Sequence, residues 1–213
     1  MRKTATSGVL TARDLEISVW LGRLPGASIE QIRRRFELGR TQGYRRLQVL
    51  ISFGLVRRLH LLAERPALYT VNGRSLRPGS YEHALALAEL IVAREGENAV
   101  IATDQELRRQ RGGRSALNGL FGPGELDVIG RCDRIPDAVE SLTGGGLVAY
   151  EIELSSKGRT RRESVLSAYA TSGYRQVRWV VPNAVLARLI GEEVERVGLD
   201  GFMEVERGLD VGA

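Results

Sequence analysis

The chain has few of the side chains on which disulfides and structural metal sites depend. Its 213 residues include one cysteine, Cys132, and two histidines, His60 and His83. A single cysteine cannot form an intramolecular disulfide, and so few nitrogen and sulfur ligands argue against a structural zinc site. Both histidines lie in or beside the basic half of the chain, so we find no Ser/His/Asp or Cys/His set for nucleophilic catalysis.

Long apolar runs are also missing. No run approaches the roughly 18 residues of a membrane-spanning helix, and no signal-peptide pattern opens the sequence. We therefore expect a cytoplasmic protein with no membrane partner. No P-loop or dinucleotide-type glycine motif is present, since the glycines at 144–146 are better explained as a hairpin turn. The hydrophobic content of 43% is typical of globular domains, and 213 residues leave room for two of them.

Lysine is scarce, because 29 of the 31 basic residues are arginine and only Lys3 and Lys157 are lysine. The distribution of charge is more informative than its sum of +5. Residues 1–78 carry 15 basic and 5 acidic side chains, a balance of +10, whereas residues 79–213 carry 16 and 21, a balance of −5. A basic half of this kind favours a polyanionic partner.

Residues 39–71 have the pattern of a helix followed by a β-hairpin. We expect Thr41 to cap the helix and Gly54 to end it. Two β-rich runs follow, at residues 55–61 and 67–71, separated by a turn that contains Pro66. The apolar residues that share one face of the expected helix are Leu47, Leu50 and Ile51.

Two further helices are expected upstream, each with a capping box. Thr11 pairs with Asp14 in the first box and Ser28 with Gln31 in the second. Three helices and a hairpin follow the plan of a winged helix, and the succession from Thr41 through Arg58 resembles the third helix and wing of the large bacterial winged-helix regulators. The resemblance implies that residues 1–78 form a winged-helix domain whose third helix enters the major groove.

The face of the third helix away from its apolar stripe carries arginine and glutamine. These side chains pair bidentately with guanine and adenine edges, and arginines on the hairpin would meet phosphates or the minor groove. The alternative is a merely solvated face, but the one-sided charge favours double-stranded DNA as the partner. The candidate DNA-binding residues are Arg40, Gln42, Tyr44, Arg45, Arg46, Gln48, Arg57, Arg58 and Arg65.

Residues 74–79, which include Arg77-Pro78-Gly79, are typical of a linker, so the second domain is expected to span residues 79–213. The helix expected from Tyr81 to Arg94 is either a dimerisation helix or the first helix of that domain, and the two are not exclusive. A homodimer with two-fold symmetry is the default for winged-helix proteins. Residues 112–124 are rich in glycine and are expected to form a loop.

Residues 134–139 and 147–154 predict a second hairpin, whose later strand places Glu151 and Glu153 on one face. Two carboxylates within an apolar strand are costly and need compensation. Asp137 could approach Glu151 and complete the oxygen-rich set that Mg²⁺ prefers. Alternatively, the glutamates lie on an open face and pair with nearby arginines, namely Arg159, Arg161, Arg162 or Arg175.

These residues resemble the motif of the PD-(D/E)xK nuclease superfamily. Pro136-Asp137 matches its first element, and Glu151-Ile152-Glu153 stands where the family has a carboxylate, a spacer and a lysine. A helix capped by Thr160 and Glu163, and a strand at residues 176–181, fit the order of the family's core. The resemblance implies catalytic roles for Asp137, Glu151 and Glu153, with Asp137 and Glu151 holding Mg²⁺. Glutamate at 153 departs from the pattern, so Lys157 is the candidate lysine.

Both halves together resemble the replication-relaxation proteins of actinobacterial plasmids and integrative elements. The resemblance implies a DNA-binding accessory or regulatory factor of element replication or transfer, with a nuclease-like domain that need not cleave. The expected fold is α+β, with an N-terminal winged helix-turn-helix and a restriction-endonuclease-like domain. The alternatives are a transcriptional regulator whose C-terminal domain dimerises or senses a ligand, and a Mg²⁺-dependent DNA-nicking enzyme.

Overall fold

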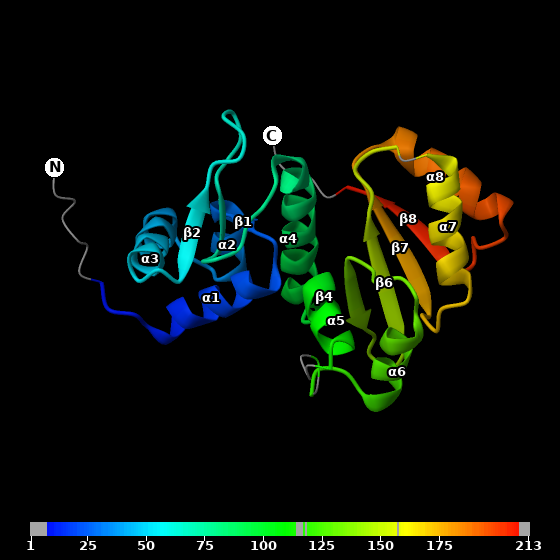
Figure 1. Ribbon diagram of the computed structural model, residues 1–213, viewed down its shortest axis with the longest axis horizontal. Helices are drawn as coiled ribbons and strands as arrows, with labels where there is room; N and C mark the ends of the chain where they lie inside the picture. The colour runs from blue at the N-terminus through cyan, green and yellow to red at the C-terminus, as the bar shows by residue number, and fades with distance from the viewer. Residues whose placement is uncertain (1–7, 114–116, 118, 157, 209–213) are drawn as a thin grey trace. The chain divides into compact units, whose positions relative to one another are not determined.

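The computed structural model describes residues 8–113, 117, 119–156 and 158–208. The fold is α+β, with two sheets (Figure 1). The chain divides into two compact units, Met1–Val92 and Ala93–Ala213, and each is described by itself. The division lies inside helix α4 (Tyr81–Gly96), beyond the linker expected at residues 74–79. None of the helices in the described part of the chain has the length and hydropathy needed to cross a membrane.

The first unit alternates helices with a small antiparallel sheet whose strand order is β1-β3-β2. Strands β2 and β3 form the hairpin, with Arg57 opposite Thr70 and Arg58 opposite Tyr69. In chain order the elements are α1 (Ala12–Arg23), β1 (Ala27–Ser28), α2 (Ile29–Arg35), α3 (Arg40–Ser52), β2 (Val56–Leu59) and β3 (Leu68–Val71).

Local signals begin and end these helices. The capping boxes of Thr11 with Asp14 and of Ser28 with Gln31 are both present, which confirms the starts of α1 and α2. The prediction that Thr41 caps α3 is wrong, because the helix begins at Arg40 and its N-cap, Gly39, makes no side-chain hydrogen bond. Gly54 follows α3 with a φ of 70°, a left-handed conformation that glycine adopts without strain.

Helices α2 and α3 approach each other closely at Gly43. A Cβ atom at this position would lie 2.7 Å from Cγ of Arg33, so the stem of that arginine occupies the space that a larger residue would need. The apolar faces of the three helices are buried in the unit's core, which includes Ile17, Trp20, Leu21, Ile32, Leu47 and Leu50. The close contact fixes how α3 is held on α2.

The first turns of α4 are bonded to the first unit. The Tyr81 hydroxyl donates to the Pro66 carbonyl at 2.7 Å, and Nε2 of the buried Gln31 donates to the Leu85 carbonyl at 2.8 Å. The apolar side chains of α4 are buried within this single chain. These contacts make the first part of α4 an element of the first unit.

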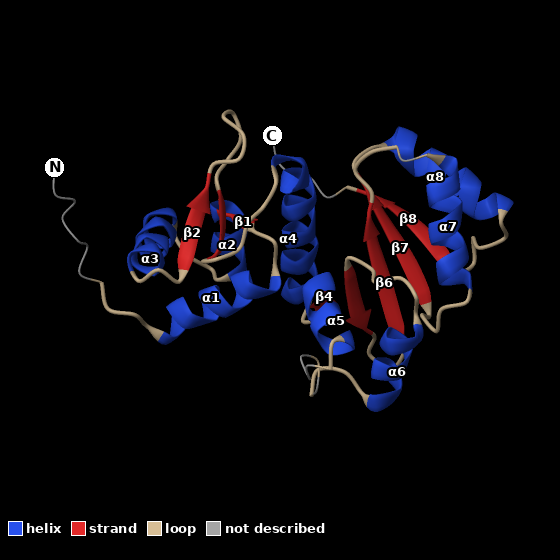
Figure 2. Cartoon of the chain, viewed as in Figure 1, coloured by secondary structure: helices blue, strands red, loops and turns tan. Residues whose placement is uncertain are grey.

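The second unit is built on a five-stranded sheet with the order β4-β5-β6-β7-β8 (Figure 2). Strands β4, β5 and β6 are antiparallel neighbours, whereas β7 is parallel to β6 and β8 to β7. Helices α7 and α8 make the two crossovers. The elements are β4 (Val100–Thr103), α5 (Asp104–Arg111), α6 (Pro123–Arg131), β5 (Ala138–Ser141), β6 (Leu147–Ile152), α7 (Arg159–Ala170), β7 (Gln176–Val181), α8 (Ala184–Arg196) and β8 (Met203–Arg207).

One face of this sheet packs against α7 and α8. Ala149 and Trp179 from the strands share a core with Leu166 of α7 and Ile190 of α8. Helix α6 follows the loop expected at residues 112–124 and overlaps only its last two residues. It begins at Pro123, whose fixed φ suits the first helical position, and the N–H of Gly122 donates to the Glu125 carboxylate at 2.8 Å.

Candidate functional site

Helix α3 presents a polar, basic face to solvent. Leu47 and Leu50 are buried on one side, while the side chains expected to contact DNA are exposed on the other. Arg40 and Arg45 make no ion pair with any residue that the structure describes. Five of the six expected residues of this helix are exposed, namely Arg40, Gln42, Tyr44, Arg45 and Gln48.

Arg46, the sixth, is held by α1. Its Nε donates to Oδ1 of Asp14 at 2.7 Å, and its Nη2 donates to Oδ2 of the same carboxylate and to the Val9 carbonyl. Asp14 is fully buried. Burial opposes its ionisation, but hydrogen bonds from Arg46 and Thr11 outweigh burial and hold the pKa of Asp14 below its ordinary value. The structure therefore gives Arg46 a part in holding α3 against the start of α1.

The arginines of α2 are also engaged within the unit. Arg33 donates to the Leu38 carbonyl at 3.2 Å and to Glu30 at 2.6 Å. Arg34 forms an ion pair with Glu89 of α4. Because these charges are compensated, the open positive charge of this region lies on α3 and the hairpin.

The hairpin brings one of its arginines beside α3. Tyr69 and Arg58 are cross-strand partners, so their side chains share a face. Burial raises the pKa of Tyr69, the charge of Arg58 opposes this, and Tyr44 of α3 adds to it, so Arg58 and Tyr44 both act on the Tyr69 side chain. Helix α3 packs against β2, the strand that carries Arg58.

Arg57 and Arg65 have different surroundings. Side chains alternate along a strand, so Arg57 lies on the opposite face of the hairpin from Arg58. Its Nε is buried without a hydrogen-bond partner among the described residues, as is Oγ1 of its cross-strand partner Thr70. Arg65, in the connection between β2 and β3, is exposed, and its Nη2 lies 3.3 Å from Oε1 of Glu82.

In the second unit, Glu151 lies in β6 with 6% of its surface exposed. Nε and Nη2 of Arg134 donate to its two oxygens, both at 2.7 Å, and the Tyr169 hydroxyl of α7 also donates to it. Burial raises the pKa of Glu151, the hydrogen bonds from Arg134 oppose this, and the negative charge of Asp137 adds to it. The carboxylate is thus compensated by a guanidinium.

Asp137 and Glu153 lie at the same end of the sheet. Asp137 immediately precedes β5, and its Oδ2 accepts a hydrogen bond from the Ile152 N–H at 2.7 Å. Glu153 immediately follows β6, is buried, and donates its N–H to the Val180 carbonyl at 3.0 Å. Glu153 is close to Arg162 of α7, whose pKa is raised chiefly by hydrogen bonds to Glu193 and further by Glu153. Lys157 lies outside the described residues.

The acidic residues do not form a metal site in the arrangement seen. No group of three or more His, Cys, Asp or Glu side chains in the described ranges is placed to hold a metal ion. The guanidinium of Arg134 lies against Glu151, and Oδ2 of Asp137 accepts a backbone hydrogen bond. These residues do not fit Mg²⁺ as they stand.

Sequence reasoning missed both partners of Glu151. The arginines considered for it are engaged elsewhere or exposed, since Arg159 pairs with Glu163 and Arg162 with Glu193. Helical spacing could have indicated Tyr169. It lies seven residues after Arg162, one of the arginines considered, so the two share a face of α7. From that face Tyr169 donates to Glu151 of β6, while the charge of Glu153, just after β6, adds to the raised pKa of Arg162. Arg134 carried no comparable signal.

Comparisons of the chain with protein-family models, with curated proteins and with solved structures found no match.

Proposed function

We propose that this chain is a double-stranded DNA-binding protein in which the first unit is a winged helix that inserts α3 into the major groove. The observation that carries the proposal is the exposed face of α3, where Arg40, Arg45 and Gln48 point away from a buried apolar stripe. Arginine and glutamine at such positions can pair with base edges. The resemblance to replication-relaxation proteins supports an accessory or regulatory role on a plasmid or integrative element.

The order of elements supports this proposal. Helices α2 and α3 are joined by a short turn and are followed by the antiparallel hairpin β2–β3. In a winged helix, the second of two such helices reads the groove and the hairpin contacts the DNA backbone. Arg58 lies on β2, which packs against α3, so helix and hairpin can contact one duplex together. Because Arg33, Arg34 and Arg46 are paired within the unit, the positive charge available to contact DNA lies on α3 and the hairpin.

For the second unit we propose a PD-(D/E)xK-like scaffold that does not cleave DNA. The antiparallel strands β4, β5 and β6, followed by a crossover through α7 to the parallel strand β7, support the fold. Asp137 and Glu151 lie at the same end of the sheet. Arg134 argues against cleavage, because it neutralises the carboxylate that a divalent cation would need. The unit would then serve assembly or help to clamp the DNA.

Selection from a random duplex library, followed by fluorescence anisotropy on the selected sequence, tests the first unit. We expect Arg45→Ala to lose about 1–3 kcal/mol of discrimination between bases. The matched control is Arg188→Ala, which removes the same charge from an exposed α8 residue paired with Glu192. Absence of duplex binding by the parent at low salt, or identical sequence preference in Arg45→Ala and the parent, would refute the groove assignment.

Incubation of the protein with supercoiled plasmid and Mg²⁺ or Mn²⁺ tests the second unit. We expect the plasmid to remain uncut. Nicking that Glu151→Ala and Asp137→Ala abolish would show a nuclease and overturn the non-catalytic assignment. That result would leave the DNA-binding assignment of α3 intact, because the two are measured separately.

A further inference from the structure

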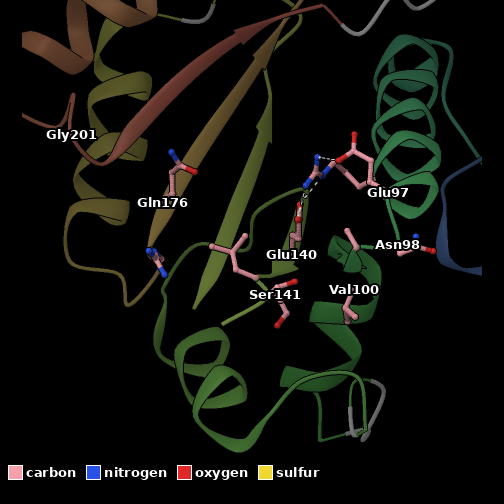
Figure 3. Close-up of a pocket in the computed structure, with 12 residues that line it drawn as sticks. Glu97, Asn98, Val100, Glu140, Ser141, Gln176 and Gly201 are labelled. Atoms are coloured by element: carbon pink, nitrogen blue, oxygen red, sulfur yellow. Dashed lines mark hydrogen bonds and ion pairs between the residues drawn. The ribbon is translucent and has the colours of Figure 1, made fainter. Parts of the chain in front are cut away.

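A pocket of about 810 Å³ opens at the end of the second unit's sheet where β6 and β7 begin (Figure 3). It is the opposite end from Asp137 and Glu153, since Leu147 starts β6 on this side and Ile152 ends it on the other. The volume lies within the range of about 300–1,000 Å³ typical of small-molecule sites. Its lining is mostly polar, and both charge signs are present among its side chains.

One wall carries an excess of negative charge. Arg94 donates through Nε and Nη2 to Glu140 at 2.8 and 2.6 Å, and through Nη1 to Glu97. One guanidinium therefore serves two carboxylates. The charge of Arg178 also acts on Glu140, but Arg178 forms ion pairs with Glu204 and Glu206. Glu140 is 4% exposed and also accepts the Tyr150 hydroxyl at 2.6 Å, so its charge is fixed in position. Dashed lines in Figure 3 mark the contacts of Arg94 with Glu97 and Glu140.

The facing wall carries a positive charge. The stem of Arg175 lies over Gly146, where a Cβ atom would be 3.1 Å from its Cδ. The guanidinium is exposed and donates to the Gly145 carbonyl at 3.4 Å, and no carboxylate of the described residues forms an ion pair with it. Its neighbour Gln176 lies across the pocket from Glu97 in Figure 3, with Glu140 between the two sides.

Neutral hydrogen-bonding groups fill the space between the charged walls. The amides of Asn98 and Gln176 and the hydroxyls of Ser141 and Thr143 line the pocket. A purely anionic ligand would meet the carboxylates of Glu97 and Glu140, and a purely cationic one would meet Arg175. A ligand that carries a positive charge at one end and a negative charge at the other can pair with both walls.

We propose that this pocket binds a small zwitterion, an amino acid or short peptide. Its ammonium group would lie toward Glu97 and Glu140, and its carboxylate would accept hydrogen bonds from the Arg175 guanidinium, a charge-assisted pairing. The amide and hydroxyl side chains between them match the donors and acceptors of peptide groups. The site is independent of the DNA-binding face of α3.

Titration of the full chain with glycine, diglycine and triglycine, followed by backbone amide NMR, tests this proposal. At least one of the three should shift the amides of Asn98, Thr143 and Gln176. Acetylating the amino end or amidating the carboxyl end of that probe should weaken binding about tenfold, equivalent to 1.4 kcal/mol. Absence of shifts with all three, or equal binding of the blocked forms, would overturn the proposal.

Two charge-removing variants assign each end of the ligand. Arg175→Gln should bind the free peptide and its amide equally, whereas Glu97→Gln should bind the free peptide and its acetylated form equally. Both side chains are exposed, so the fold should survive either change. Arg188→Gln is the matched control and should bind as the parent does. If neither variant changes the preference for free ends, the assignment of the charged walls is wrong.

Discussion

The guanidinium of Arg134 lies against the carboxylate of Glu151, with both donor–acceptor distances at 2.7 Å. Glu151 is one of the buried charges of the second unit, and Tyr169 completes its hydrogen bonding. A buried carboxylate without such partners would be strongly unfavourable. The stability of this end of the sheet therefore depends on a cation supplied by the chain itself.

Arg134→Ala should destabilise the protein by about 3–5 kcal/mol, because it leaves the buried Glu151 without a compensating charge. Chemical denaturation measured at the tryptophans would report the change. Arg131→Ala is a suitable control, since that side chain is 83% exposed and its ion pair with Asp127 spans 3.8 Å. Equal stability of the two variants would mean that Glu151 does not need Arg134.

Asp14→Asn should destabilise the first unit at neutral pH and matter less in acid. The folded-state pKa of Asp14 lies below the ordinary value of 3.8, so its ionised form stabilises the fold above that value. The contribution is lost as the pH falls through the folded-state pKa. The difference in melting temperature between parent and variant should therefore shrink below about pH 4. A difference that stays constant from neutral pH to pH 3 would contradict the ion pair with Arg46.

Gly43→Ala should not bring the stabilisation of about 1 kcal/mol that this change usually gives within a helix. The added Cβ would lie 2.7 Å from Cγ of Arg33 and push α2 away from α3. Gly191→Ala in α8 is the matched change, because a Cβ there meets nothing within 4 Å. We expect thermal unfolding to show a gain at Gly191 and a loss at Gly43, and duplex binding to weaken only in Gly43→Ala. Similar gains at both sites would refute the close contact.

Arg58→Ala should weaken binding to all duplexes alike. It should also lower the slope of log K against log salt concentration by about one in magnitude, as expected for a phosphate contact. Arg57→Ala should weaken binding less, because Arg57 lies on the face of the hairpin away from Arg58. Anisotropy across a salt series would separate the two variants. A larger effect for Arg57→Ala would mean that the opposite face of the hairpin contacts the DNA.

Much of the first unit could be predicted from sequence because its signals are local. The capping boxes at Thr11 and Ser28 and the glycine at Gly54 act within a few residues of their own positions. The engagement of Arg46 could not be predicted in this way. Its partner Asp14 lies on another helix, and no pattern of spacing connects the two.

The second unit shows the same limit more strongly. Alternation correctly predicted the strand that contains Glu151, and the strand at residues 176–181 is present as β7. The first strand of that hairpin was predicted at residues 134–139 but lies at Ala138–Ser141. The pairing of Glu151 with Arg134 and Tyr169 depends on where a connection and a helix pack, which single-residue patterns do not encode. The pocket beside Glu140 was missed for the same reason, because its walls come from α4, β5, the hairpin turn and β7.

Among the residues that the structure describes, β8 is the last strand of the second unit's sheet, and such an edge can recruit a strand from another molecule. Glu204 and Glu206 alternate along it, and both form ion pairs with the single guanidinium of Arg178 of β7. A second copy approaching edge to edge would bring like carboxylates together at close range. This repulsion should keep two copies of the protein from joining their sheets through β8.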